Sequence, residues 1–468
     1  MWRVVPLLAL LLVPAATARP SGVQGPSTGR EVVLVANAEG GTVSIVDAAS
    51  FQVLREIDVL PDGERADDPG QALLRQPVIE AAGGENYAQD QDLSPDGRTL
   101  YVSRGHRGDV AAFDLESGEL LWKVAVPGFR ADHMTLSGDG RFLWVSALTE
   151  NVVVKVDTAS HAIVGRFGGG QWPHDNHLSE DGSRIYNASI GTIVVPEESR
   201  QAMSPPPYVL TVARTADLAV ERRVEFDRGI RPVVITHDER TMFAQLSELH
   251  GLVEIDLARG EVVRTLELPV DPGVSEDDYD FEAPHHGLAI TPDERTLCAA
   301  GRASDYVALV DAPSLTALAT IEVGDAPGWA ATGPDGRHCF VPNTRADTLS
   351  VISYAQRREV ARVEVGDGPK QIEAARLPEK VAAPAPRPPR LVRACRRPGR
   401  LRMRVLGEAR AVTFRAGRHV LRDGRPPLAR TLSRRRLLRT RARRLRATVA
   451  TPTGRVRLTR SLPRCGLR

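Results

Sequence analysis

The chain has 468 residues, of which 42% are hydrophobic and 26% charged, so it holds enough apolar material for a sizeable core and for more than one domain. Its formal net charge of +2 hides an asymmetry. Residues 380–468 carry 28 of the 61 basic side chains and two of the 59 acidic ones, so the first 379 residues are strongly acidic and the rest strongly basic. After the N-terminus, no segment approaches the ~20 apolar residues of a membrane helix, which argues against such a helix in the mature chain.

The chain begins MWRVVPLLALLLVPAATARP: one basic residue, an apolar run, and then Ala16 and Ala18 in the pattern of a cleavage site. This pattern predicts a signal peptide over residues 1–18, followed by a linker over residues 19–30. Cleavage would leave a protein that is secreted, periplasmic or on the cell surface. An uncleaved membrane anchor is the alternative.

A repeated phrase organises the next part of the sequence. It is clearest in LSPDGRTLYVSRGHRGDVAAFDLESGELLWKVAV and in ITPDERTLCAAGRASDYVALVDAPSLTALATIEV. The period of roughly 40 residues, with four short apolar strands in each copy, is typical of a propeller blade. Copies begin near Tyr87, Phe129, Trp172, Gly229, Pro284 and Ala326. A seventh is split between the strands that follow Glu31 and the late segment GPKQIEAARL, so we expect an all-β, seven-bladed propeller over residues 31–378, closed by pairing of N- and C-terminal strands.

The segments VLVANAEGGTVSIVDAAS, SPDGRTLYVS and GDGPKQI resemble the YVTN-type repeats of bacterial exported propellers. The resemblance implies the fold and an exported protein. Related propellers include surface-layer proteins, sugar lactonases and domains of nitrous oxide and haem nitrite reductases, so the resemblance implies no single activity.

The basic C-terminal part follows a Pro/Ala-rich linker predicted over residues 379–392. Beyond it, RLRMRVLG, AVTFRAGRHVLRD and RLRATVATPTGRVRLTRSL alternate apolar and polar residues, which predicts a small β-sandwich over residues 393–468 that resembles bacterial immunoglobulin-like modules. Cys395 and Cys465 bracket this module, and we expect them to form a disulfide in an oxidising compartment.

The arginines of the module are suited to an anionic cell-envelope polymer or surface. Alternatively, they only keep the module soluble, or they dock it on the acidic propeller. An exported protein does not meet genomic nucleic acid, which argues against that partner. In the propeller, Cys298 and Cys339 fall on second strands of adjacent blades, where an inter-blade disulfide and two buried thiols are both open alternatives.

Polar residues recur where each innermost strand enters the channel. Counting six residues back from each blade's turn gives Gln89, Asp132, His174, Arg231, His286 and Gly328, with Lys370 from the closing strand. A register uncertainty of one residue adds three neighbours. The expected ligand-binding set is Asp132, His133, His174, Asp175, Arg231, His285, His286 and Lys370. Three insertions, near residues 61–86, 196–207 and 271–284, should emerge on the same face, and long loops are often functional.

The basic side chains of this set favour a binding or scaffold protein that presents its axial face to an anionic small ligand or a protein partner. The second hypothesis is an exported oxidoreductase with copper, zinc or iron on His133, His174 and His286. The third is a lactonase-like hydrolase with a divalent ion held by carboxylates such as Asp90 and Asp92. The sequence does not decide whether the protein is an enzyme, and these histidines can also serve only to satisfy hydrogen bonds at strand entrances.

Overall fold

A computed structural model describes most of the chain. The described residues are 23–64, 79, 85–192, 204–275, 279, 283–382, 390–397, 400–406, 409–425, 428–439, 444–451 and 454–461. The predicted signal peptide, much of the three insertions and Cys465 lie outside them. Within them, no helix is both long and apolar enough to cross a membrane.

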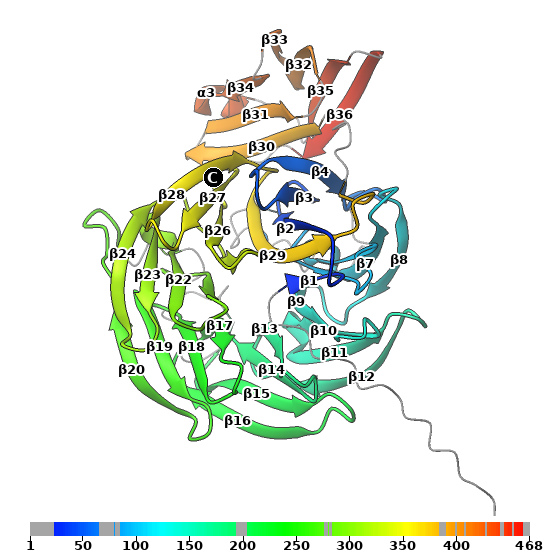
Figure 1. The fold of residues 1–468 in the computed structure, drawn as a ribbon. Helices are drawn as coiled ribbons and strands as arrows, with labels where there is room; N and C mark the ends of the chain where they lie inside the picture. Colours follow the sequence, from blue (N-terminus) through cyan, green and yellow to red (C-terminus); the bar gives the residue numbers. More distant parts are fainter. Residues whose placement is uncertain are drawn as a thin grey trace, which may run out of the picture.

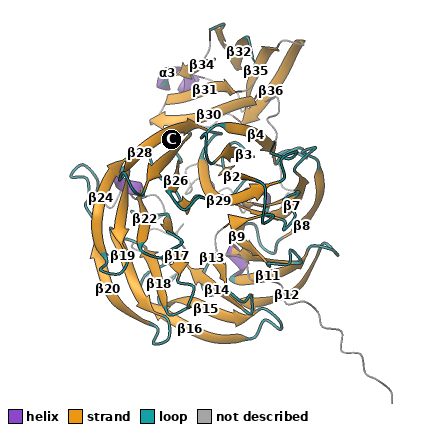
Figure 2. Cartoon of the chain, in the orientation of Figure 1, coloured by secondary structure: helices purple, strands orange, loops and turns teal. Residues whose placement is uncertain are grey.

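Seven sheets surround a central axis in the described part of residues 23–382 (Figures 1 and 2), so the expected propeller fold is confirmed. Three four-stranded sheets come first, formed by β5 (Asp90–Leu93), β6 (Thr99–Arg104), β7 (Asp109–Asp114) and β8 (Leu120–Ala125); by β9 (Ala131–Leu136), β10 (Phe142–Ala147), β11 (Val152–Asp157) and β12 (Ala162–Gly168); and by β13 (Pro173–Leu178), β14 (Arg184–Ser189), β15 (Tyr208–Arg214) and β16 (Val220–Phe226).

Three more sheets of the same order follow. They are formed by β17 (Ile230–Ile235), β18 (Thr241–Leu246), β19 (Gly251–Asp256) and β20 (Glu261–Glu267); by β21 (Leu288–Ile290), β22 (Thr296–Gly301), β23 (Tyr306–Asp311) and β24 (Thr316–Glu322); and by β25 (Ala331–Thr332), β26 (His338–Asn343), β27 (Thr348–Ser353) and β28 (Arg358–Glu364). Short 3-10 turns at Gly105–Arg107, Leu148–Glu150 and Arg302–Ser304 follow three of the second strands.

The turn between the first and second strand of each blade explains the repeated phrase. In the second blade, the Ser94 hydroxyl accepts the backbone N–H of Thr99 at 2.8 Å and donates to Asp96 at 2.6 Å. Gly97 follows with φ +70°, a left-handed conformation that glycine adopts without strain. Ser137 and Asp139 repeat this hydrogen bond in the next blade. The phrase therefore encodes a side-chain-locked turn that sets the register of each blade.

The seventh sheet contains strands from both ends of the propeller, in the order β1 (Val23–Gln24), β29 (Pro369–Leu377), β2 (Arg30–Asn37), β3 (Thr42–Asp47) and β4 (Val53–Asp58). Antiparallel pairing of β2 with β29 is the contact that the sequence predicts. The innermost strands of successive sheets also contact one another around the whole ring. The fifth strand, β1, was not predicted. It lies parallel to β29 within the segment expected to be a linker, and the Gln24 side chain donates to Asp92 at 2.6 Å.

A disulfide joins Cys298 on β22 to Cys339 on β26, with both residues fully buried. It decides between the two alternatives that the sequence left open. Because β22 and β26 belong to neighbouring sheets, this bond ties two blades together inside the packed interface that also contains Leu309 and Val341.

The C-terminal module is a sandwich of two sheets. One contains β30 (Arg390–Arg397), β31 (Arg400–Leu406) and β34 (Ala429–Leu432), and the other contains β33 (His419–Asp423), β32 (Ala411–Ala416), β35 (Arg444–Thr451) and β36 (Gly454–Ser461), with a short helix α3 (Arg434–Arg439). Met403, Phe414 and Leu445 pack between the sheets. Strand β30 begins three residues before the expected boundary at 393. Whether Cys395 pairs with Cys465 stays a prediction.

The module rests on the propeller through an arginine of β31. The guanidinium of Arg404, 5% exposed, lies 3.2 Å from the carboxylate of Glu364 and 3.6 Å from that of Asp347. Since both partners belong to the propeller, at least one arginine of the module serves docking on the acidic body.

Candidate functional site

The entrances of the innermost strands bring most of the expected polar residues together near the axis. Strand β9 supplies Asp132 and His133, β13 supplies His174, and β17 supplies Arg231. We define the axial site as Gln89, Arg130, Asp132, His133, His174, Arg231, His286, Trp329 and Lys370. All of these side chains are buried except that of Lys370, which is partly exposed.

Gln89 connects the charged groups of the axial site, although it is not among the expected ligand-binding residues. Its carbonyl oxygen accepts hydrogen bonds from Lys370 Nζ at 3.0 Å and from Arg130 Nη2 at 3.3 Å. Its amide nitrogen donates to Asp132 Oδ1 and lies 2.9 Å from His133 Nε2. One neutral amide therefore links two cationic groups to a carboxylate and an imidazole.

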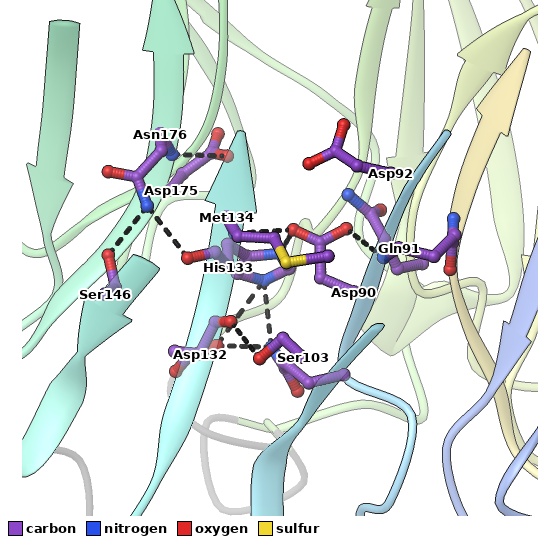
Figure 3. A network of polar contacts seen from close by, with 12 residues as sticks. Asp90, Gln91, Asp92, Ser103, Asp132, His133, Met134, Ser146, Asp175 and Asn176 are labelled. Carbon is purple, nitrogen blue, oxygen red and sulfur yellow. Dashed lines mark hydrogen bonds and ion pairs between the residues drawn. The ribbon is translucent and has the colours of Figure 1, made fainter. Parts of the chain in front are cut away.

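His133 lies between two carboxylates, Asp90 and Asp132 (Figure 3). Its Nδ1 is 3.1 Å from Asp90 Oδ2, and its Nε2 is 3.7 Å from Asp132 Oδ1. Burial alone would lower the pKa of His133, but the hydrogen bond and the charge of Asp90 outweigh burial and raise it. His133 therefore favours the protonated state more than an ordinary histidine does.

The pKa values of His174 and His286 shift in the opposite direction to that of His133. Burial lowers the pKa of each ring well below its usual value, and nearby positive charges, including those of Arg231 and Lys370, lower it further. His286 Nδ1 donates to the backbone oxygen of Gly328 at 2.9 Å, which leaves its Nε2 as the basic nitrogen of the neutral ring. His174 Nδ1 is buried and has no hydrogen-bond partner among the described residues. These two neutral rings lie edge to face, with centroids 5.6 Å apart.

The cationic groups of the axial site act on each other. Burial and the charge of Arg130 lower the pKa of Lys370 to about 7, and the charge of Asp132 offsets this only in part. Arg231 is 1% exposed, and its Nε donates to Ser247 Oγ at 3.1 Å. Arg130 lies 3.5 Å from Asp132. Asp132 thus acts on two of the cationic side chains, Arg130 and Lys370.

Trp329 completes the axial site and was not predicted from the sequence. Its ring stacks on His133, with centroids 4.8 Å apart and planes 23° from parallel, and it also contacts His286 at 5.4 Å. The expected entrance residue of this blade, Gly328, directly precedes Trp329 in the sequence. The sequence did contain a signal for Trp329, because this position carries a bulky aromatic residue where the other blades have small or polar side chains.

Two aspartates of the inner strands have a structural role that the sequence did not separate from binding. Asp90 Oδ2 accepts the backbone N–H of Met134 at 2.9 Å, and Asp175 Oδ2 accepts that of Val233 at 3.2 Å. Each bond joins one innermost strand to the next. Asp175 also lies 2.9 Å from His177 Nε2.

An acidic layer lies farther along the channel than the basic entrance. Burial, followed by the charge of Asp90, raises the pKa of both Asp92 and Glu373. Asp92 and Glu373 therefore favour the neutral, protonated form more than ordinary carboxyl groups do.

His285 does not join the axial group. Its Nε2 lies 3.1 Å from the Tyr306 hydroxyl, and its ring packs edge to face on His250 at 5.4 Å. Burial lowers the pKa of His285 to about 3. Neighbouring residues of an extended segment point in opposite directions. His285 was expected in the ligand-binding set because the register was uncertain by one residue, and its side chain points away from the axial site that contains His286.

The set that could hold a metal ion differs from the expected three histidines. Potential ligand atoms of Asp132, His133 and His174 lie within 4.8 Å of one another, whereas His286 is not part of this group. Two imidazoles and a carboxylate suit zinc, iron or copper. However, the Gln89 amide nitrogen already contacts Asp132 and His133, and Arg130 and Lys370 surround the group with positive charge. A divalent ion would have to displace that amide.

The fold and the axial site together define a β-propeller with a polar channel entrance. Among solved structures, hydrazine synthase of Kuenenia stuttgartiensis is similar, with a TM-score of 0.54, 17% sequence identity, and coverage of 74% of this chain and 99% of that one. At this identity the likeness concerns the fold alone. No family model matches the chain, and no curated protein matches it. The resemblance to YVTN repeats therefore stays a prediction.

Proposed function

We propose that this protein is an exported binding propeller that captures a small anionic ligand at the axial site and is held at an anionic surface by its basic C-terminal module. The observation that carries the proposal is that the charges of Arg231 and Lys370 act on the neutral rings of His174 and His286, while Arg130 and Lys370 both bind the Gln89 carbonyl oxygen beside them. Export is supported by the N-terminal sequence and by the Cys298–Cys339 disulfide, since such bonds persist in oxidising compartments.

A carboxylate, phosphate or sulfate suits this arrangement. Guanidinium and ammonium groups make charge-assisted hydrogen bonds to such oxyanions, and these bonds are stronger where water is excluded. The Nδ1 of His174, which has no partner among the described residues, can carry the ring proton and donate to the anion, because a neutral imidazole has two tautomers. An acidic segment of a protein partner would offer the same carboxylates as a free ligand.

Calorimetric titration with phosphate, sulfate and a tricarboxylate would test the anion proposal. We expect Arg231→Met to abolish binding of each anion that the wild type binds in this titration. Arg240→Met is the matched control, because Arg240 belongs to the same blade and its side chain is 84% exposed. Equal affinity of the two variants, or no anion binding by the wild type, would contradict the small-ligand proposal. Binding of acidic peptides without free anions would instead favour a protein partner.

A metal-dependent oxidoreductase is the second candidate, favoured by the Asp132, His133 and His174 group. Elemental analysis of protein purified without chelators distinguishes the two. Stoichiometric copper, zinc or iron that is lost in His174→Ala but kept in His285→Ala would support the metal site. Metal-free protein that stays metal-free after reconstitution would leave the anion proposal standing.

A further inference from the structure

The outer sheet of the C-terminal module carries an arginine-rich face with a regular arrangement. Alternate residues of β32, β33 and β35 point to solvent, whereas Val412, Phe414 and Ala447 point to the core. We define the arginine face by the exposed residues Arg415, Arg422, Arg446 and Arg455, which come from β32, β33, β35 and β36 respectively.

The register places one pair of like charges side by side. Arg415 pairs with Arg446 across β32 and β35, and Arg446 pairs with Thr459 on β36. Neighbouring strands lie about 4.8 Å apart, and like charges directly opposite each other destabilise a sheet. Within the described residues, the side chains of the arginine face have no hydrogen bond or ion pair.

The module has almost no carboxylates to neutralise this face. Residues 390–468 contain two acidic residues, Glu408 and Asp423. Asp423 is buried and binds Arg430 at 2.6 Å, and Glu408 lies outside the described residues. The described part of the module therefore offers no carboxylate that relieves the repulsion between Arg415 and Arg446, and an external anion would do so.

The arginine face lies on the sheet of the sandwich that does not contain Arg404. Arg404 docks the other sheet of the sandwich onto Asp347 and Glu364, and β32, β33 and β35 form the layer on the far side (Figure 1).

We propose that the arginine face binds the phosphate groups of an anionic phospholipid bilayer. This inference rests on the proposed surface attachment by the module and is independent of the axial site. The arginines spread in two dimensions over four strands, which matches a planar array of headgroups better than a single polymer strand. Residues 390–468 contain no Trp or Tyr on which bases could stack, which argues against single-stranded nucleic acid. Among the described residues of the module, the one large apolar side chain that is exposed is Val420, so attachment is electrostatic and superficial.

Sedimentation of the full-length mature protein with phosphatidylcholine vesicles, with and without phosphatidylglycerol, tests the proposal. We expect binding only with the anionic lipid and at low salt. The double variant Arg415→Gln/Arg446→Gln should lose roughly five-fold in vesicle partitioning for each arginine removed. Arg435→Gln/Arg436→Gln removes the same charge from exposed residues of α3 and is the control that should bind like the wild type.

Three results would overturn the inference. Equal losses in the two double variants would show that only net charge matters. Wild-type protein that pellets with isolated cell envelopes but not with anionic vesicles would point to an envelope polymer, which leaves surface attachment intact. Wild-type protein that pellets with neither would remove the surface attachment itself. Folding is checked independently, because relief of the repulsion should leave the melting temperature of the Arg415→Gln/Arg446→Gln variant unchanged or raised.

Discussion

Gln89 and Lys370 lie 281 residues apart in the sequence and share a hydrogen bond of 3.0 Å. The bond joins the second blade to β29, the last strand of the propeller in the sequence. Since Gln89 also contacts Asp132 and His133, this one amide determines where the cationic and anionic groups of the axial site stand relative to each other.

Anion binding should weaken as pH rises through about 7. Burial and the charge of Arg130 lower the pKa of Lys370 to about 7, so the ammonium that attracts an anion is lost there instead of near its usual value. His133, whose pKa is raised, contributes a decline of the same sign. Calorimetry across neutral pH measures the profile. Lys370→Arg keeps the positive charge at every pH measured, so the anion affinity of this variant should depend less on pH. An unchanged pH profile would show that another group, and not Lys370, causes the decline.

Asp175→Asn should destabilise the fold by about 2 kcal/mol, because it leaves the partly exposed His177 without its charged partner and weakens the bond to Val233. Burial raises the pKa of Asp175, but His177 outweighs burial and lowers it. On the acid side the stabilisation is therefore complete above the ordinary aspartate pKa and disappears as pH falls through the lowered one. On the alkaline side it needs protonated His177, whose pKa burial lowers but the charge of Asp175 raises overall. Urea unfolding at neutral and acidic pH should show the difference shrinking in acid. Asp217→Asn, an exposed partner of Arg214, should have little effect at either pH.

Removal of the inter-blade disulfide by Cys298→Ala/Cys339→Ala should cost about 4 kcal/mol in the chain-entropy model for a sequence separation of 41. Chemical unfolding with and without a reductant measures this. Reductant should bring the wild type close to the variant. If reductant also lowers the unfolding free energy of the variant, the disulfide predicted between Cys395 and Cys465 accounts for that decrease.

Gly25→Ala should release β1 and destabilise the protein by about 2 kcal/mol. Gly25 has φ +88°, and a Cβ atom there would lie 2.1 Å from the backbone oxygen of Arg376. Hydrogen exchange should accelerate at the Leu93 N–H, which donates to Gln24 Oε1 at 2.6 Å. Gly118→Ala is the control, since Gly118 has φ +77° with nothing within 4 Å of its added Cβ. A similar loss in both variants would mean that backbone strain alone, and not displacement of β1, is responsible.

The repeated turn and strand pattern made the propeller predictable, because each copy encodes the same local hydrogen bonds, as at Ser94 and Ser137. Counting back from those turns also located Asp132, His174, Arg231, His286 and Lys370. The position of His285 was unpredictable at one-residue precision, because irregular strand entrances decide which way a side chain points. The strand β1 was unpredictable for a different reason: two residues carry no periodicity, and their partner β29 lies at the other end of the propeller sequence.

The pairing of β2 with β29 governs when the fold can form. Arg30 pairs with Leu377, so the edge of β2 opposite β3 has no partner until nearly the whole propeller sequence has been made. Contacts of such high sequence separation slow folding, because the entropy of closing a very long loop must be overcome before the contact forms. For the exported protein proposed above, such slow closure would keep the newly synthesised chain unfolded during translocation, and we expect protease resistance to appear only once β29 has paired with β2.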